Sequence, residues 1–354
     1  MARAGPGRRG GPAEPILRLL PLLPLLLLPC LADGTLGGEV GDLTLGSGGG
    51  GQACSTVFVV ALTGADHAQL RPFKAMAEAA LASALHFHPS GCVAVLSNEA
   101  GVFESLRKAT RGRLEECAYG EDVFAGPATF AYDRLHAYER FLAEEATARH
   151  SRHVVLMDAD LLFVGSVEQT LERGPSFDVA LTFRSTGFQP INTGLVLVRS
   201  GAAARGAALL REVVQVFDGL TWGRDPKRML GDQEAVWRWM ARGGDRWWDF
   251  QRMAPQRGTI GGYHVLLLPA TEYNWTPHVG CAMSASARVL HFKGREKGRM
   301  LPAWAALRRA IKLGGGGAPL RHALHDVLPW IGVDEPMHAI HKARGTLIQS
   351  CPAT

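Results

Sequence analysis

The chain has 354 residues, a formal net charge of +5 and 47% hydrophobic residues. This length allows one large α/β domain or two small ones. The positive excess is modest and no basic run is interleaved with aromatic residues, so the composition argues against nucleic acid as a partner.

Residues 1–32 are expected to form a signal segment. Arg8 and Arg9 precede an apolar run over residues 16–31, and Ala32 supplies the small residue of a signal-peptidase site. The run is shorter than the about 20 residues that a membrane-spanning helix needs, and it contains prolines. A cleaved secretory signal is therefore favoured over an uncleaved membrane anchor. Such an anchor would be the only contact of the chain with a membrane that we expect. Either one predicts a lumen of the secretory pathway, the Golgi or the endoplasmic reticulum.

The cysteines fit an oxidising compartment. They are Cys30, Cys54, Cys92, Cys117, Cys281 and Cys351. If Cys30 leaves with the signal, the remaining five cannot all pair within one chain, so one or two disulfides are expected and the pairing stays open. The absence of a CxxC unit argues against a cysteine zinc site.

Strand and helix patterns alternate along the chain after a glycine-rich stem at residues 33–53. Strands are expected at 55–61, 92–98, 154–157, 177–183, 194–200, 263–269 and 287–292. Helices are expected at 72–87, 132–149, 203–217 and 232–242. The alternation predicts a single α/β domain at 54–313, with a mostly parallel sheet covered by helices on both faces, and a tail at 314–354 with one short helix.

Two carboxylates follow the apolar strand VVLM, in the segment VVLMDADLL. Asp158 and Asp160 stand two apart, so in an extended segment both side chains point the same way. In open α/β sheets, ligands bind beyond the carboxyl ends of strands. Hard oxygen ligands suit Mn²⁺ or Mg²⁺, which commonly bridge to substrate phosphates. The alternative is a pair of solvated turn aspartates.

A second motif ends the strand ARVLHF. It reads HxxGxxK, with His291, Gly294 and Lys297. An imidazole can complete a Mn²⁺ site, a glycine lets the backbone approach phosphate, and a lysine supplies a positive charge for a diphosphate. A histidine at a strand end is otherwise usually a core residue.

Together these blocks resemble glycosyltransferase family 8, the glycogenin-like retaining transferases of the GT-A fold, over about residues 56–300. The resemblance implies a UDP-sugar donor, with Asp158, Asp160 and His291 as metal ligands. It implies donor contacts from Leu62, Thr63, Arg134, Asp158, Ala159, Asp160, Gly294 and Lys297. It places Asn192, Asp232 and Gln233 as catalytic residues at the transferred sugar. The acceptor is expected to be a glycan or glycoprotein.

The chain also departs from the family. Gly298 and Arg299 follow Lys297 where the family usually has Pro-Trp, and the opening turn carries Gly64 and Ala65. A neighbouring DxD family of arabinosyl and xylosyl transferases and a non-catalytic GT-A binding or scaffold protein remain alternatives. A sugar-nucleotide pyrophosphorylase is disfavoured because no glycine-rich phosphate loop follows the first strand.

Asn274 lies in an N-glycosylation sequon, Asn-Trp-Thr. The same position coincides with a family motif beside the donor pocket, where a glycan would obstruct binding. A pocket role is therefore favoured over glycosylation.

Overall fold

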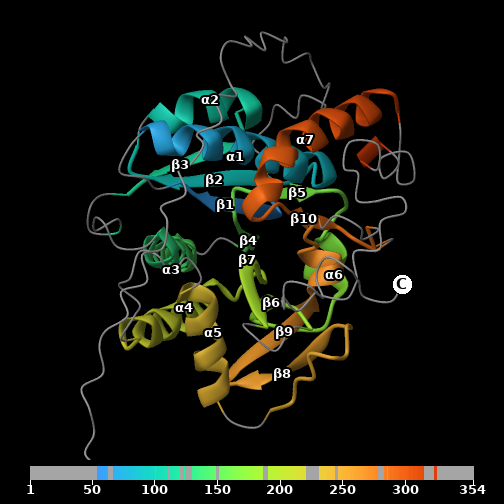
Figure 1. Ribbon diagram of the computed structural model, residues 1–354. Helices are drawn as coiled ribbons and strands as arrows, with labels where there is room; N and C mark the ends of the chain where they lie inside the picture. The colour runs from blue at the N-terminus through green and yellow to red at the C-terminus, as the bar shows by residue number, and fades with distance from the viewer. Residues whose placement is uncertain are drawn as a thin grey trace, which may run out of the picture. The chain divides into compact units, whose positions relative to one another are not determined.

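A sheet of eight strands organises the part of the chain that the structure, a computed structural model, describes (Figure 1). The described residues are 54–62, 67–99, 101–110, 112–119, 123, 130–148, 151–185, 190–220, 231–243, 246–277, 283–284, 286–314 and 323–324. The predicted signal segment, the stem, most of the tail and Thr63 lie outside them. All described residues belong to one compact unit within Thr44–Thr354.

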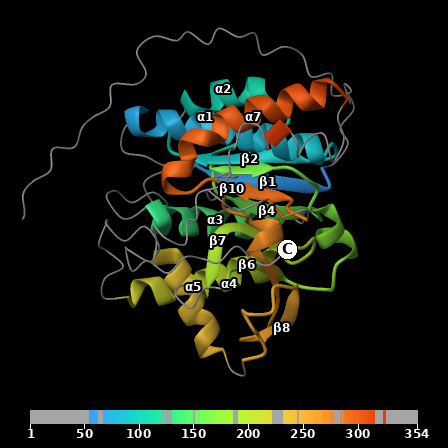
Figure 2. The same cartoon turned by 45° about the vertical axis from the view of Figure 1, so that its right-hand side comes forward.

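The strand order across the sheet is β3-β2-β1-β4-β7-β6-β9-β8. The bounds are β1 (Thr56–Ala61), β2 (Cys92–Ser97), β3 (Leu114–Ala118), β4 (His153–Met157), β6 (Val179–Phe183), β7 (Ile191–Val198), β8 (Gln256–Ile260) and β9 (Tyr263–Pro269). A separate antiparallel pair joins β5 (Leu161–Phe163) to β10 (Val289–His291). This pair brings the segment after the Asp-Ala-Asp motif beside a strand about 130 residues later. Figure 1 labels both strands, and Figure 2 shows β10 from another side.

Most strands run in one direction. β1 pairs in parallel with β2 and β4, and β2 with β3; β6 pairs in parallel with β9. Only β7 and β8 run opposite to the other strands of this sheet. The predicted fold class, a mostly parallel sheet within a single α/β domain, is confirmed.

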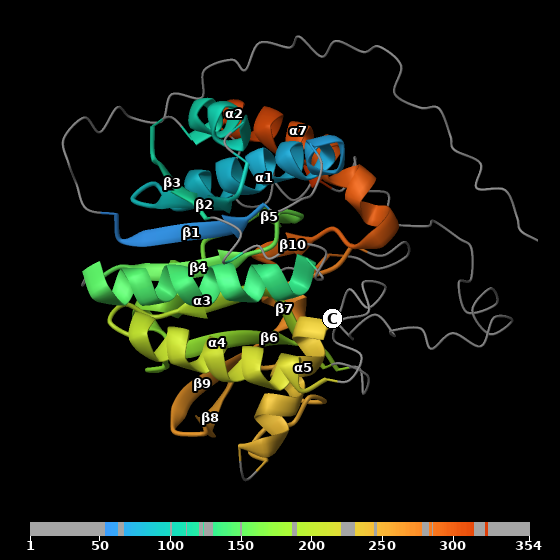
Figure 3. The ribbon, with the colours of Figure 1, turned by 90° about the vertical axis from the view of Figure 1, so that its left-hand side faces the viewer.

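Helices cover both faces of the sheet (Figure 3). On one face lie α1 (His67–Phe87), α2 (Gly101–Thr110) and α7 (Lys297–Lys312); on the other lie α3 (Phe130–Ala148), α4 (Ala203–Asp218) and α5 (Gly231–Arg242). Successive side chains along β1 point to opposite faces of the sheet. Phe58 and Val60 therefore pack in the hydrophobic core that includes α1, whereas Val57 and Val59 pack in the core that includes α3. Short elements complete the chain: η1 (Gln169–Arg173), α6 (Ala270–Tyr273) and η2 (Gly294–Glu296).

Besides the short elements β5, η1, α6 and η2, two strands and two helices were not expected from the sequence. The strands β3 and β8 lie at the two edges of the sheet, and polar residues interrupt the apolar ones in their sequences LEECA and QRGTI. An edge strand is partly solvated, so it lacks the apolar run that marks a buried strand. The helix α2 does carry an apolar stripe, with Val102, Phe103 and Leu106 buried, but it is short, and α7 contains Pro302.

Two cysteines form a disulfide, Cys54–Cys92, as expected for an oxidising compartment. Cys117 is a free thiol, and burial, aided by neighbouring glutamates, raises its pKa to about 12. Within the described residues, no helix is both long and apolar enough to cross a bilayer.

Candidate active site

Polar side chains from several elements meet beyond the carboxyl ends of the central strands β4 and β6. Asp158 directly follows β4, and its backbone N–H donates to the carbonyl of Gly194 on β7, at 2.8 Å. Because β7 is antiparallel to β4 and β6, its first residues lie beside the carboxyl ends of both. The buried side chains of Asn192 and Thr193 therefore enter the same region as the Asp-Ala-Asp turn.

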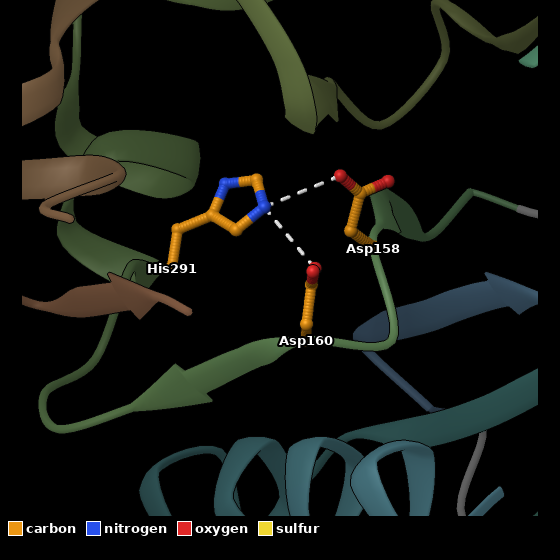
Figure 4. Close-up of side chains that lie close together, drawn as sticks. All are labelled: Asp158, Asp160 and His291. Carbon is orange, nitrogen blue, oxygen red and sulfur yellow. Dashed lines mark ion pairs between the residues drawn. The ribbon is translucent and has the colours of Figure 1, made fainter. Parts of the chain in front are cut away.

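Asp158, Asp160 and His291 form the centre of the site (Figure 4). One ligand atom from each lies within 4.8 Å of the others. The Nε2 atom of His291 is 3.1 Å from Asp160 Oδ1 and 3.5 Å from Asp158 Oδ2. Two carboxylate oxygens and one imidazole nitrogen at this spacing form a donor set that suits Mn²⁺ or Mg²⁺. The arrangement fits a divalent cation, and the sequence predicted these three residues together.

The outer oxygens of both carboxylates are held by cations. Arg134 forms an ion pair with Asp158 Oδ1, and Lys297 Nζ lies 3.0 Å from Asp160 Oδ2. These contacts turn the remaining oxygens, Asp158 Oδ2 and Asp160 Oδ1, toward His291. Burial raises the pKa of Asp160, but its interaction with His291 and the positive charge of Lys297 outweigh that effect and hold the pKa well below its usual range. Asp160 is therefore ionised and able to bind a metal.

A chain of hydrogen bonds fixes which nitrogen of His291 carries the proton. The N–H of Gly194 donates to Asn192 Oδ1 at 2.9 Å, which identifies that atom as the oxygen. The amide of Asn274 must then turn its Nδ2 toward Asn192, at 2.7 Å, and its Oδ1 toward His291 Nδ1, also at 2.7 Å. His291 consequently donates from Nδ1 and leaves the lone pair of Nε2 facing the carboxylates.

The imidazole of His291 is neutral at neutral pH. Burial is the main cause that lowers its pKa, to about 4; Lys293 adds to the effect and Asp160 opposes it. A neutral imidazole is the form that binds a metal ion.

Asn274 is thereby buried beside His291 rather than exposed on the surface. It is 2% exposed, and its Nδ2 atom, the atom that would carry a glycan, donates to Thr182 Oγ1 at 2.9 Å as well as to Asn192. This position favours the pocket role over glycosylation.

Gly194 is required by the close approach of the metal-site side chains. A Cβ atom at this position would lie 2.4 Å from His291 Cε1 and 2.8 Å from Asp158 Oδ2. No side chain fits there. The sequence reading singled out Asn192 in the INTG segment but not this glycine, whose meaning depends on a histidine almost 100 residues away.

Asp232 and Gln233 begin α5 on the other side of Arg134. Asp232 is 1% exposed, pairs with Arg134 and accepts a hydrogen bond from Thr193 Oγ1 at 2.5 Å through Oδ2. Its Oδ1 and the Nδ2 of Asn192 are buried without a hydrogen-bond partner among the described residues. Buried polar atoms are normally paired, so both are candidates for ligand contacts.

Two cations were missed by the sequence reading. Arg184 follows β6, and its Nη2 donates to Gln233 Oε1 at 3.0 Å. Lys293 lies between His291 and Gly294; burial, followed by the charge of Arg184, lowers its pKa to about 7. The rule that ligands bind beyond strand ends could have drawn attention to Arg184.

The other predicted donor-binding residues have varied positions. Leu62 lies in the core, and its carbonyl accepts a hydrogen bond from Ser97 Oγ at 2.7 Å. Ala159 is buried in the same cluster as Leu62, and Thr63 lies outside the described residues. Gly294 is exposed with φ of +53°, a left-handed conformation that favours glycine.

The HxxGxxK motif ends at the start of a helix, because Lys297 is the first residue of α7. Gly298 and Arg299, which replace the Pro-Trp of the family pattern, continue that helix. Arg299 forms an ion pair with Glu296 at 3.0 Å across its first turn.

Comparison with known proteins shows that this chain is similar to several solved structures. No family model and no curated protein matches the chain. A glycosyltransferase involved in glycosylation of the major capsid of PBCV-1 is similar, with 12% identity, a TM-score of 0.42, and coverage of 70% of this chain and 98% of that chain. The galactosyltransferase LgtC, in complex with donor and acceptor sugar analogs, has 13% identity, a TM-score of 0.40, and coverage of 82% and 100%.

The glycosyltransferase GlyE of Streptococcus pneumoniae TIGR4 has 15% identity and a TM-score of 0.42, and the match covers 82% of this chain and 63% of GlyE. At such identities and TM-scores, none of these likenesses assigns an activity to this chain. The solved structures that are similar to this chain thus include glycosyltransferases.

Proposed function

We propose that this chain is a metal-dependent glycosyltransferase that moves a sugar from a UDP-sugar to a glycan or glycoprotein acceptor. The observation that carries the proposal is the convergence of Asp158 Oδ2, Asp160 Oδ1 and His291 Nε2, each held in place by a separate partner. A structural ion pair would not require the tautomer of His291 to be fixed through Asn274 and Asn192. A metal site does require it.

The three residues would bind Mn²⁺ or Mg²⁺ and, through it, the diphosphate of the donor. A bound divalent cation supplies neutralisation of the negative charge that grows on the leaving diphosphate. Lys297, 3.0 Å from Asp160 Oδ2, supplies a further positive charge at the same place. Removing one such preorganised group typically costs about 3–4 kcal/mol of transition-state stabilisation.

The sugar would lie between the metal triad and the start of α5. Arg134 bridges Asp158 and Asp232 and so sets the separation between the metal site and the sugar site. The unpaired Asn192 Nδ2 and Asp232 Oδ1 are the groups available to hydroxyls of the sugar or to the developing positive charge at its anomeric carbon. Gln233, held by Arg184, borders the same space. Retention of anomeric configuration is part of the proposal through the family resemblance.

The site of action that we propose is the lumen of the secretory pathway. The disulfide Cys54–Cys92 supports an oxidising compartment, in keeping with the apolar segment near the N-terminus. Immunofluorescence of the tagged full-length chain with Golgi and endoplasmic reticulum markers tests this part.

The activity is tested by incubating the purified protein with a panel of UDP-sugars and Mn²⁺ and measuring UDP release onto water and onto sugar acceptors. We expect release with one donor class, and its loss in a folded Asp160→Asn variant. The panel also separates a xylosyl or arabinosyl transferase from a hexosyl transferase. Metal-dependent UDP binding without turnover on any donor would instead favour the non-catalytic scaffold.

A further inference from the structure

Arg184 carries a desolvated charge that lacks an anionic partner in the described structure. Its Nη2 donates to a neutral amide oxygen, Gln233 Oε1, at 3.0 Å, and its Nε is buried without a hydrogen-bond partner. No ion pair joins it to a carboxylate of the described residues. The adjoining sequence, residues 185–190, reads STGFQP and contains no acidic residue.

This lack of a partner is unusual because an arginine remains charged at all physiological pH values. Burial lowers the pKa of Arg184, which is the direction expected for a cation without a nearby anion. By contrast, two other cations of the site are paired, Arg134 with Asp158 and Asp232, and Lys297 with Asp160. Buried charges are generally paired, so a bound ligand is the natural source of the missing anion.

The position of Arg184 shows which part of a ligand would carry that anion. The metal triad and Lys297 lie on the Asp158 side of Arg134, whereas Arg184 contacts Gln233, on the Asp232 side. Arg184, through its contact with Gln233, therefore borders the space proposed for the sugar.

We infer that Arg184 binds the carboxylate of a uronic acid, so the enzyme handles uronic acid sugars rather than only neutral ones. The inference rests on the proposed function and specifies its substrate class. A guanidinium binds a carboxylate through paired N–H donors, and both Nε and Nη2 lie on one edge of the group. The carboxylate belongs to the transferred sugar of the donor or to the sugar of the acceptor, and the two sources need separate measurements.

The donor source is tested by calorimetric binding with Mn²⁺. UDP-glucuronate is compared with UDP-glucose, and UDP-galacturonate with UDP-galactose, so that a sugar epimer does not decide the outcome. We expect the wild type to bind one uronate at least roughly tenfold more tightly than its neutral counterpart, as charged hydrogen bonds typically give. In Arg184→Gln this ratio should fall to about one, and Arg184→Lys should keep part of it.

The acceptor source is tested by the KM for uronate-ended and neutral oligosaccharides in UDP release, with the same variants. Arg257→Gln is the matched control, because it removes the same charge from the exposed edge strand β8. An Arg184-dependent preference in either measurement supports the inference. If neither shows one while UDP still binds with Mn²⁺, the inference is wrong and the proposed function stands; if UDP does not bind, the proposed function itself fails.

Discussion

Each side chain at the metal site depends on a particular neighbour. The lone pair of His291 Nε2 faces the carboxylates only because Nδ1 donates to Asn274, and Asn274 is oriented by Asn192. Asn192 in turn is oriented by a backbone N–H. The orientation of the imidazole of His291 therefore depends on Asn274, on Asn192 and on the backbone N–H that donates to Asn192.

Replacing Asn274 tests this dependence. Asn274→Leu removes the acceptor for His291 Nδ1, and loss of such a partner typically reduces metal affinity about 10–100-fold. The control Thr182→Val removes the other acceptor of the Asn274 amide without touching His291. We expect a much smaller effect on Mn²⁺ affinity there, measured by calorimetry in the presence of UDP. Equal affinities in both variants would refute the orienting role.

Replacing Gly194 tests the packing at the same site. In Gly194→Ala, the added methyl would displace His291 or Asp158, since it would lie 2.4 Å and 2.8 Å from their atoms. Crowding of this kind typically costs about 1–3 kcal/mol. We expect Mn²⁺ affinity to fall at least roughly tenfold. Gly298→Ala is the control, because no heavy atom lies within 4 Å of its added carbon; a variant at Gly194 with unchanged affinity would contradict the geometry.

At the scale of elements, the site depends on connections between β4, β5 and the helices behind them. A buried histidine, His88, connects the last turn of α1 to the segment before η1 through two hydrogen bonds. Its Nδ1 donates to the carbonyl of Ala84 at 2.7 Å, and its Nε2 accepts from the N–H of Val167 at 2.9 Å. Only the neutral imidazole can accept that second bond.

This arrangement makes stability depend on pH. Burial lowers the pKa of His88 to about 4, despite the bond to Ala84, from an ordinary value of about 6.5. Between these two values the unfolded state binds a proton that the folded state does not, so the free energy of unfolding falls as the pH falls. The expected loss from His88 is about 3 kcal/mol between pH 7 and pH 4.

Urea unfolding at several pH values tests this expectation. His88→Leu should be less stable than the wild type at pH 7, since it leaves the N–H of Val167 unpaired, but its loss of stability toward pH 4 should be smaller. His86→Gln is the control, because His86 lies on the same helix and is only half-buried. If the free energy of unfolding falls as steeply toward pH 4 in His88→Leu as in the wild type, groups other than His88 cause the pH dependence.

At the scale of the whole molecule, the sequence predicts the sheet and the grouping of Asp158, Asp160 and His291. Buried strands such as β4 and β7 carry apolar runs, and the residues after β4 carry the ligands, so pattern and chemistry point to the same place. The triad was predicted through two motifs whose chemistry is complementary, not through any contact between them. The pair β5–β10 is what joins them in space.

The remaining features depend on three-dimensional contacts that leave no local pattern. Gly194 resembles an ordinary strand glycine until His291 is placed against it. Arg184 resembles an ordinary residue after a strand until no carboxylate partner is found for it among the described residues. The edge strands β3 and β8 were missed for a different reason, because half-solvated strands lack an apolar run.

The central claim is that Asp158, Asp160 and His291 bind a divalent metal that in turn binds the diphosphate of UDP. Calorimetric titration of UDP with Mn²⁺ and with chelator, on the wild type and on Asp160→Asn, tests it directly. We predict that Mn²⁺ tightens UDP binding at least roughly tenfold in the wild type and has little effect in the folded variant. Equal UDP affinity with and without Mn²⁺ in the wild type, or a full Mn²⁺ response in Asp160→Asn, would contradict the claim.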